Sequence, residues 1–334
     1  MHTMRLSKPG QAVTRPLVMT ECSNPVPGEG EILLQVTACA VCRTDLQICE
    51  GDLAARRLPI VPGHQIVGRV ESVGSGVTTW KAGDRAGVAW LAGTDGNCAK
   101  CTSGRENLCE GAQFTGWDRD GGYATHAVAR ADFAFPLPDP FGDLDAAPLL
   151  CGGVIGYRSL KISGVRPGGR LGLYGFGASA GAVIQVARHW GCRVFVCTRS
   201  AAERDRATSL GAEWVGGYLE KPPVPLDAAI TFAPVGSVVA AALGALDRGG
   251  TVAINAIHLD RLPEMPYADL WWERSLRSVA NFSRADVVEF LQLAAKIPVR
   301  TTYDVYPLVD ANIALERLAA GQVRGAAVLQ CAGS

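Results

Sequence analysis

Two cysteines and one histidine lie in sequence frames that suit a metal with a chemical role. Cys42 lies in the run AVCRTD, His64 in PGHQ and Cys151 in LCGG. Two thiolates and one imidazole leave zinc a fourth position that a substrate oxygen can occupy, which distinguishes a catalytic zinc from a structural one. A zinc with an open position polarises an alcohol or a carbonyl near neutral pH. The three residues therefore predict a catalytic zinc, and the alternative is two buried cysteines with a structural histidine.

A glycine-rich run downstream, GFGASA, indicates a dinucleotide that carries hydride. The run follows an expected strand and opens an expected helix, which is the context that such a motif requires. Its glycines allow a tight turn and let backbone approach a pyrophosphate at the helix N-terminus, and alanine is tolerated at the third position. The alternative is a glycine-rich turn without a ligand. The residues expected to contact the dinucleotide are Gly175, Gly177, Ala178 and Ala180.

Length and composition favour an enzyme of two domains and give no sign of a nucleic-acid or membrane partner. The chain has 334 residues, a formal net charge of zero and 19% charged residues, so no basic field attracts nucleic acid. The first residues lack the apolar run of a signal peptide, and no apolar stretch is long enough for a bilayer. Eleven cysteines are an odd number, and their frames suit metal binding better than a disulfide lattice. We expect a cytoplasmic protein.

The pattern of elements changes near residue 152. The earlier part is rich in Gly and Pro, with short strands such as 31–36 and 66–73, and predicts a mostly β domain. The later part alternates strands with helices of about a dozen residues, which predicts an α/β fold with a doubly wound parallel sheet. Its expected strands are Arg170–Tyr174, Arg193–Cys197, 226–232, 250–255 and 275–279, and its expected helices include 178–190 and 201–210. From about 299 a strand, a helix (about 309–320) and a final strand return to the first domain. The expected domains are 1–152 with 299–334, and 153–298.

Taken together, these motifs resemble the zinc-dependent medium-chain alcohol dehydrogenase family over essentially the whole chain. The frames GHQIVGRVESVG, GVTTWKAGDRAGV, CAKCTSGRENLC, GGYATHAV and PLLCGGVIGYRSL stand in the family's order. The resemblance implies a GroES-like catalytic domain and a Rossmann domain. It implies zinc ligands at Cys42, His64 and Cys151, and hydride transfer between a nicotinamide coenzyme and an alcohol or aldehyde.

The resemblance also assigns residues around the zinc. Thr44 matches a hydroxyl that takes the substrate proton and passes it onward through the coenzyme ribose. Asp45 is either an acceptor that orients His64 or an ordinary cap aspartate. Two positions depart from the family, because Gln47 stands where a histidine often ends the relay and Gln65 stands where glutamate is commoner. An amide can neither act as a base nor carry a charge, so we expect a working site with altered proton release and ligand exchange.

The cysteine cluster matches the last three members of the family's structural zinc pattern. Cys98, Cys101 and Cys109 are separated by two and by seven residues. The first member should lie three residues before Cys98, where Asp95 stands. Carboxylate oxygen is an accepted zinc ligand, so Asp95 and three thiolates can close a tetrahedral shell. We therefore expect a structural zinc, against the alternative of three free thiols.

The residues expected to contact the adenosine end of the coenzyme predict a preference for NADP(H) over NAD(H). NAD-binding chains carry an acid about twenty residues after the glycine loop, where it binds the ribose diol. That position falls at Thr198, and no carboxylate is present there. Arg199 can grip a 2′-phosphate, assisted by Ser200 or Arg204. The alternative is a solvated loop arginine.

Family position assigns the remaining residues. Arg43 and Arg324 are expected to clamp the pyrophosphate, or else to form surface salt bridges. Trp90, Leu91 and Ile155 are expected to line a pocket for primary alcohols and aldehydes, aliphatic or aromatic. A zinc-independent quinone or enone reductase and a non-catalytic nucleotide-binding protein remain alternatives on the same scaffold. The family favours a homodimer or homotetramer that forms by edge pairing of the nucleotide-domain sheets.

Overall fold

The structure is a computed structural model that describes residues 1–331, and its internal contacts divide them into two compact units. Unit 1 comprises Met1–Cys151, Ser283–Ala295 and 300–331. Unit 2 comprises Gly152–Phe282 and Lys296–Val299. The mostly β unit and the parallel-sheet unit confirm the expected α/β fold class. The division by contacts differs from the expected domain boundaries at Ser283–Ala295, which groups with unit 1.

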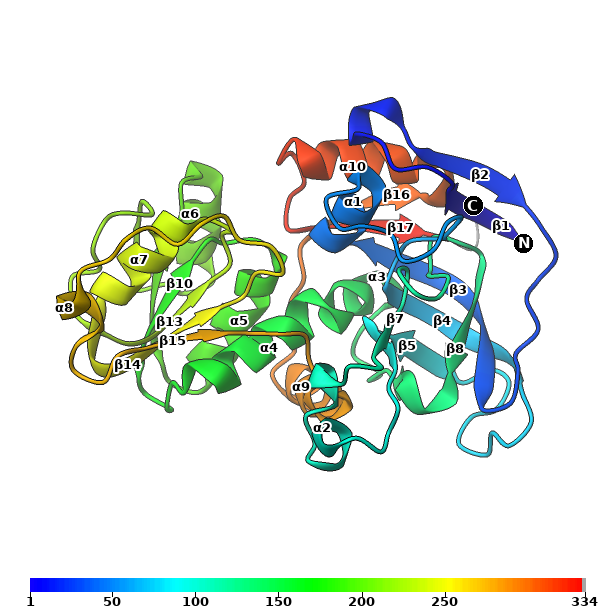
Figure 1. Cartoon of the computed structure of the whole chain (residues 1–334), viewed down its shortest axis with the longest axis horizontal. Coiled ribbons are helices and arrows are strands. Elements are labelled where there is room, and N and C mark those ends of the chain that lie inside the picture. The colour runs from blue at the N-terminus through cyan, green and yellow to red at the C-terminus, as the bar shows by residue number, and fades with distance from the viewer. Residues whose placement is uncertain (332–334) are drawn as a thin grey trace. The chain divides into compact units, whose positions relative to one another are not determined.

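Unit 1 is built on a mostly antiparallel sheet, whose strands run in the order β16-β17-β3-β4-β5-β9, with β8 also paired to β3. The long β3 is central because β8 pairs with its first half, β17 with its second half and β4 with most of its length. Figure 1 shows the red strand β17 beside the blue strand β3, so strands from the two ends of the sequence pair in this sheet. The strands are β3 (Glu31–Val41), β4 (Gln65–Val73), β5 (Arg85–Val88), β8 (His126–Arg130), β9 (Ala134–Pro136), β16 (Tyr303–Pro307) and β17 (Ala326–Gln330).

Shorter elements surround this sheet. Two small antiparallel pairs, β1 with β2 and β6 with β7, lie outside it. The pairs are β1 (His2–Leu6) with β2 (Leu17–Glu21) and β6 (Leu91–Gly93) with β7 (Gln113–Phe114). The helices are α1 (Arg43–Glu50), α2 (Ala99–Thr102), α3 (Asp143–Ala146), α9 (Arg284–Lys296) and α10 (Ala311–Ala319). The 3-10 turns are η1 (Ala12–Thr14), η2 (Glu106–Leu108), η3 (Ala131–Phe133), η4 (Ala147–Leu150) and η5 (Leu308–Asp310).

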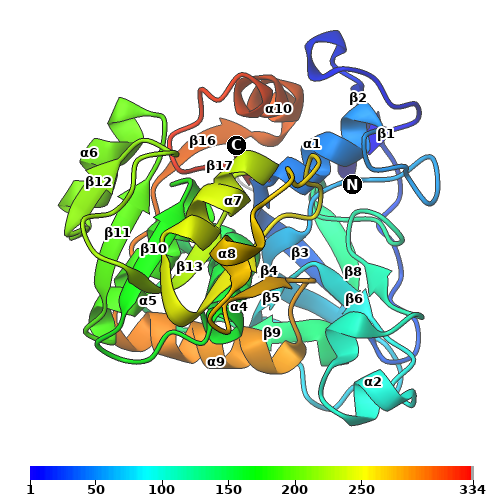
Figure 2. The same cartoon turned by 60° about the vertical axis from the view of Figure 1, so that its left-hand side comes forward.

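Unit 2 is a parallel sheet in the order β12-β11-β10-β13-β14-β15, and Figure 2 shows β12, β11, β10 and β13 side by side. Apart from Arg170, Arg193 and Asp227 near their starts, the central strands are buried and mostly apolar, as expected when helices cover both faces. The strands are β10 (Arg170–Tyr174), β11 (Arg193–Cys197), β12 (Trp214–Gly216), β13 (Leu226–Thr231), β14 (Leu246–Ile254) and β15 (Ser275–Ser278). The helices are α4 (Gly152–Ser163), α5 (Ala178–His189), α6 (Ala201–Ser209), α7 (Gly236–Gly244) and α8 (Tyr267–Leu270).

The topology places chemistry-bearing residues at the ends of strands in each unit. In unit 1, β3 ends at Val41, so Cys42 and α1 follow directly. In unit 2, β10 and β11 are parallel neighbours whose last residues, Tyr174 and Cys197, are in register. The glycine loop after β10 and the loop after β11 therefore lie beside each other, at the strand ends where doubly wound sheets bind ligands. Within residues 1–331, no helix is long and apolar enough to cross a membrane.

Candidate active site

The three residues predicted to hold the catalytic metal lie together in unit 1, although Cys42 and Cys151 are far apart in the sequence. Cys42 precedes α1, His64 precedes β4 and Cys151 follows η4. Their ligand atoms all lie within 4.8 Å of one another. His64 is 1% exposed, and both cysteines are partly buried. Two sulfurs and one imidazole nitrogen at this spacing suit zinc, and the set leaves a fourth position for another ligand.

Asp45 orients this cluster through hydrogen bonds to its residues. Its carboxylate is completely buried and accepts three hydrogen bonds. Oδ2 accepts from the backbone N–H of Cys42 at 2.8 Å, while Oδ1 accepts from the backbone N–H of Gly63 at 3.1 Å and from Nδ1 of His64 at 2.9 Å. A carboxylate can only accept here, so the His64 proton lies on Nδ1 and Nε2 is the metal-facing nitrogen. Asp45 is therefore both a helix cap and the residue that orients His64.

The charges of the cluster follow from these contacts. Burial lowers the pKa of His64, but the buried Asp45 carboxylate and Cys42 outweigh it and raise that pKa to about 10. A hydrogen bond with Cys151 holds the pKa of Cys42 well below its usual value, against burial and with help from His64. The same hydrogen bond, together with burial, raises the pKa of Cys151 well above its usual value. Thiol and imidazole groups must be deprotonated at the ligating atom to bind a metal, so metal binding would release protons from this cluster.

Trp90 closes one side of the cluster with an aromatic stack. Its ring meets the His64 ring edge-on, with centroids 4.8 Å apart and planes at 74°. Phe114 and Trp117 stack on Trp90 at 5.0 Å and 5.9 Å. The guanidinium of Arg56 lies 3.9 Å from the Trp117 ring and pairs with Asp118. Flat apolar walls of this kind favour flat apolar ligands.

The other residues assigned near the metal have distinct surroundings. Thr44 lies on α1 with Oγ1 3.9 Å from the Cys42 sulfur, and Gln47 is one turn further along. Oε1 of Gln47 is buried and has no hydrogen-bond partner among residues 1–331, so it can accept a hydrogen bond from a ligand hydroxyl or water. Nε2 of Gln65 donates to the backbone carbonyl of Ala40 at 3.2 Å. A glutamate at this place would set a carboxylate against a carbonyl, which explains why an amide fits.

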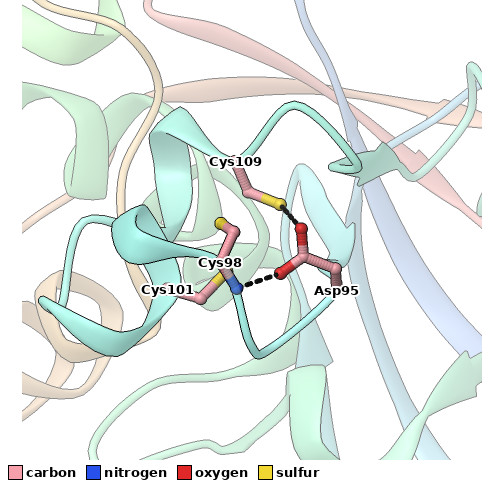
Figure 3. A group of neighbouring side chains, drawn as sticks. All are labelled: Asp95, Cys98, Cys101 and Cys109. Atoms are coloured by element: carbon pink, nitrogen blue, oxygen red, sulfur yellow. Dashed lines mark hydrogen bonds between the residues drawn. The ribbon is translucent and has the colours of Figure 1, made fainter.

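The predicted structural site is also assembled, in the loop around α2. Asp95, Cys98, Cys101 and Cys109 each present one ligand atom, all within 4.8 Å of one another. Figure 3 shows the Asp95 carboxylate facing the sulfurs, with Oδ1 taken by the Cys98 backbone N–H at 2.9 Å and Oδ2 accepting from the Cys109 thiol at 3.1 Å. The Cys98 and Asn97 backbone donors and the Cys109 thiol hold the pKa of Asp95 well below its usual range. Oδ2 is the oxygen that would become free for a metal once Cys109 loses its proton.

The cysteine loop is tied to α9 by a buried ion pair. Glu106, with 9% of its side chain exposed, accepts from the side chain of Arg284 and from its backbone N–H. Burial opposes ionisation of Glu106, but Arg284 outweighs it and lowers the pKa of that carboxyl. Leu91, predicted to line the substrate pocket, packs under this loop with Cys109 and Phe133. Its place in a pocket stays a prediction.

The glycine loop of unit 2 has the geometry of a phosphate cradle. Gly175 has φ +92°, a conformation that only glycine adopts readily, and a Cβ on Gly177 would meet no atom within 4 Å. Gly177 precedes α5, and no side chain caps the first N–H groups of that helix in the described structure. Ala178 and Ala180 occupy its first turn. Uncapped donors at a helix N-terminus with open space in front of them suit an anion such as a pyrophosphate.

A carboxylate on α6, not predicted from the sequence, is hydrogen-bonded to the residue that follows β11. Thr198, at the predicted ribose position, is fully buried, and its hydroxyl donates to the carboxylate of Glu203 on α6. Nη1 of Arg204 donates to the Thr198 carbonyl at 2.9 Å, and Ser200 caps α6 by accepting from the Glu203 backbone N–H. Arg199 is exposed. The run Ser200-Ala-Ala-Glu203 is a capping-box pattern, so the placement of Glu203 could have been predicted from local sequence rules.

The two remaining arginines belong to unit 1, and the last pocket residue belongs to unit 2. Arg43 begins α1 and is exposed. Arg324 is 85% exposed and pairs with Asp304 at 3.2 Å, as the salt-bridge alternative describes. Ile155 is partly buried on α4 in unit 2. Their roles toward coenzyme and substrate stay predictions.

Comparison with known proteins agrees with the fold and the cluster. Residues 28–139 match the family model for an alcohol dehydrogenase GroES-like domain, and residues 180–296 match the model for a zinc-binding dehydrogenase. A probable alcohol dehydrogenase, AdhA, of Mycobacterium tuberculosis is 48% identical over 98% of this chain and 97% of its own length. A cinnamyl alcohol dehydrogenase structure from Sorghum bicolor has a TM-score of 0.90 at 28% identity, covering 100% of this chain and 98% of that one.

A cobalt- and zinc-bound thermostable alcohol dehydrogenase from Pyrobaculum aerophilum has a TM-score of 0.89 at 27% identity, covering 99% of both chains. A parallel-sheet dinucleotide unit joined to a sheet-rich unit that carries a two-cysteine, one-histidine cluster defines the zinc-type medium-chain dehydrogenases. The chain belongs to this zinc-binding alcohol dehydrogenase family, which confirms the resemblance inferred from its motifs.

Proposed function

We propose that this alcohol dehydrogenase interconverts primary alcohols and aldehydes with NADP(H), using zinc bound by Cys42, His64 and Cys151. The observation that carries the proposal is the convergence of these three ligand atoms within 4.8 Å, with Asp45 orienting the imidazole. The aromatic stack of Trp90, Phe114 and Trp117 beside His64 supports flat substrates, aromatic ones included. The cinnamyl alcohol dehydrogenase among the similar structures agrees with that choice.

Zinc held by Cys42, His64 and Cys151 would polarise the substrate oxygen, and a bound nicotinamide coenzyme would supply or accept the hydride of the carbinol carbon. The protein's own residues set up this chemistry. Asp45 keeps the His64 proton on Nδ1, so that Nε2 stays a ligand. The Thr44 hydroxyl, on the same helix, receives the substrate proton at Oγ1 and donates its own onward. Gln47 cannot continue the transfer as a base, and its unpartnered Oε1 instead accepts a hydrogen bond from the next hydroxyl or water in the chain.

The coenzyme assignment rests on unit 2. Gly175, Gly177 and the first turn of α5, including Ala178 and Ala180, would hold the pyrophosphate. Arg199 is exposed next to the β11 end and can meet a 2′-phosphate, with Ser200 and Arg204 beside it. Arg43 and Arg324 would contribute positive charge from unit 1.

Further assignments complete the proposal. The catalytic domain comprises 1–152 with 299–334, and the Rossmann domain comprises 153–298. Most of α9 lies within the second range in sequence, although by its contacts it groups with unit 1. Asp95, Cys98, Cys101 and Cys109 bind a structural zinc. Trp90, Leu91 and Ile155 line the substrate pocket. The protein acts in the cytoplasm as a homodimer or homotetramer, and the position of β15 at the edge of its sheet supports edge pairing.

Coenzyme consumption with a panel of aliphatic and aromatic aldehydes tests the reaction, with NADPH and NADH in parallel, before and after zinc removal. Zinc-dependent turnover that is faster with NADPH is the expected result. Turnover that survives zinc removal would refute the catalytic metal and favour a zinc-independent reductase. Zinc-dependent turnover that is faster with NADH would refute the coenzyme preference alone.

A further inference from the structure

Glu203 occupies the place where a ribose-binding acid is missing from the sequence of β11. The residue that follows β11, Thr198, bears no charge, but its hydroxyl is bonded to the Glu203 carboxylate. A negative charge therefore does lie at the end of β11, although it is supplied by the next helix. Because β10 and β11 end in register, this carboxylate lies on the strand-end edge that carries the glycine loop.

The orientation of α6 supports the same placement. Arg206 donates through Nη2 to the carbonyls of Phe176 and, at 3.2 Å, Gly177, which ties α6 to the glycine loop. Residues three apart on a helix share a face, so Glu203 lies on the side of α6 that Arg206 turns toward the loop. Burial lowers the pKa of Arg206, and the negative charge of Glu203 opposes that effect.

We propose that Glu203 is the acceptor for the adenosine ribose diol and the residue that limits the preference for NADP(H). A carboxylate accepts hydrogen bonds from a 2′-hydroxyl and a 3′-hydroxyl, and repels a 2′-phosphate. Arg199, which directly follows Thr198, is exposed and attracts that phosphate. In this subsite Glu203 favours NAD(H) and Arg199 favours NADP(H). The coenzyme preference is the difference between their two effects. This inference rests on the proposed binding of a nicotinamide dinucleotide by unit 2.

A charge series at position 203 tests the inference by binding alone. The zinc-loaded full chain is titrated calorimetrically with ADP-ribose and with its 2′-phosphorylated form, which need no substrate and no turnover. Glu203→Gln and Glu203→Lys remove and then reverse the charge, and both keep a long polar side chain. Asp205→Asn and Asp205→Lys are matched controls, because Asp205 is an exposed acid on the same helix two residues away.

The ratio of affinities for the phosphorylated over the unphosphorylated ligand should rise about tenfold in Glu203→Gln and about tenfold again in Glu203→Lys. Both Asp205 variants should stay within about twofold of the parent, as expected for screened surface charges. A role restricted to capping α6 would weaken both ligands equally and would not order the variants by charge. An unchanged ratio across the Glu203 series, with binding intact, overturns the Glu203 proposal alone. Absence of binding of both ligands by the parent overturns it together with the coenzyme assignment.

Discussion

Replacing Asp45 by asparagine should loosen the catalytic metal without emptying the site. The carboxylate accepts from Cys42, Gly63 and His64, and it is completely buried. Asparagine has one oxygen, so its amide nitrogen must face at least one of these donors. If the oxygen stays at the Oδ1 place, the cap on Cys42 is lost, which costs about 1 kcal/mol. If it takes the Oδ2 place, Gly63 and His64 both lose their acceptor, at about 1–3 kcal/mol each.

The effect on zinc follows from the His64 contact. A carboxylate behind a ligating imidazole strengthens that ligand, and its loss lowers metal affinity about 10–100-fold. We expect the lower end of this range, because asparagine can still offer one neutral acceptor to Nδ1. The free energy of unfolding of the metal-free chain should fall by about 1–6 kcal/mol, the span of the two orientations.

Competition with a chromophoric zinc chelator at neutral pH measures the affinity, and urea denaturation measures the stability. A Cys101→Ser background removes a ligand from the second cluster, so that the catalytic site is followed alone. Asp52→Asn is the matched control, because Asp52 is an exposed carboxylate shortly after α1. The reasoning is refuted if Asp45→Asn keeps zinc affinity within about twofold of the control and unfolds at the same urea concentration.

Three further outcomes are expected. Thr44→Ala should lower turnover at least about tenfold while Thr44→Ser retains it, and equal turnover in all three proteins would exclude the relay. In the metal-free chain, the raised pKa of His64, about 10, contributes stability that is complete below the unfolded pKa of 6.5 and is lost as the pH rises through about 10. The urea concentration at the unfolding midpoint should therefore fall between these two pH values, and it should fall less in Asp45→Asn. Asp95→Asn should release one of two zinc ions per chain to a chelator about tenfold more readily, and an anomalous-scattering peak bound by Cys98, Cys101 and Cys109 but remote from Asp95 would contradict its role as a ligand.

The sequence was most informative where residue type alone restricts the structure. The strands Arg170–Tyr174 and Arg193–Cys197 were predicted with the bounds that the structure has, because buried apolar runs between glycine turns admit few alternatives. The strand expected at 31–36 continues to Val41 instead. Its second half is apolar on both faces, so no alternation marks where it ends. Helix α1 was not predicted, because a helix of eight residues is shorter than the window over which a helical period can be recognised.

The sites were partly predictable for a similar reason. Each metal cluster was found from ligand types and frames, but the state of its protons was not, because this depends on contacts between distant residues such as Cys42 and Cys151. Leu91 was assigned to the pocket by its position next to Trp90, but Leu91 begins β6 whereas Trp90 precedes that strand, and the two side chains have different neighbours. Trp90 faces His64, and Leu91 packs under the cysteine loop.

The three carboxylates with the most specific surroundings share one local structure. Asp45, Asp95 and Glu203 each interact within a few residues of a turn or helix start, and each also bonds to a side chain of a functional cluster. A local rule therefore predicts only part of each residue's contacts, while the remaining partners emerge only from the fold. Alanine substitution at these positions removes the cap and the charge together, so loss of activity would not separate folding from chemistry. Amide substitutions preserve size and part of the cap while they remove the charge, and only a response that follows charge identifies the second role.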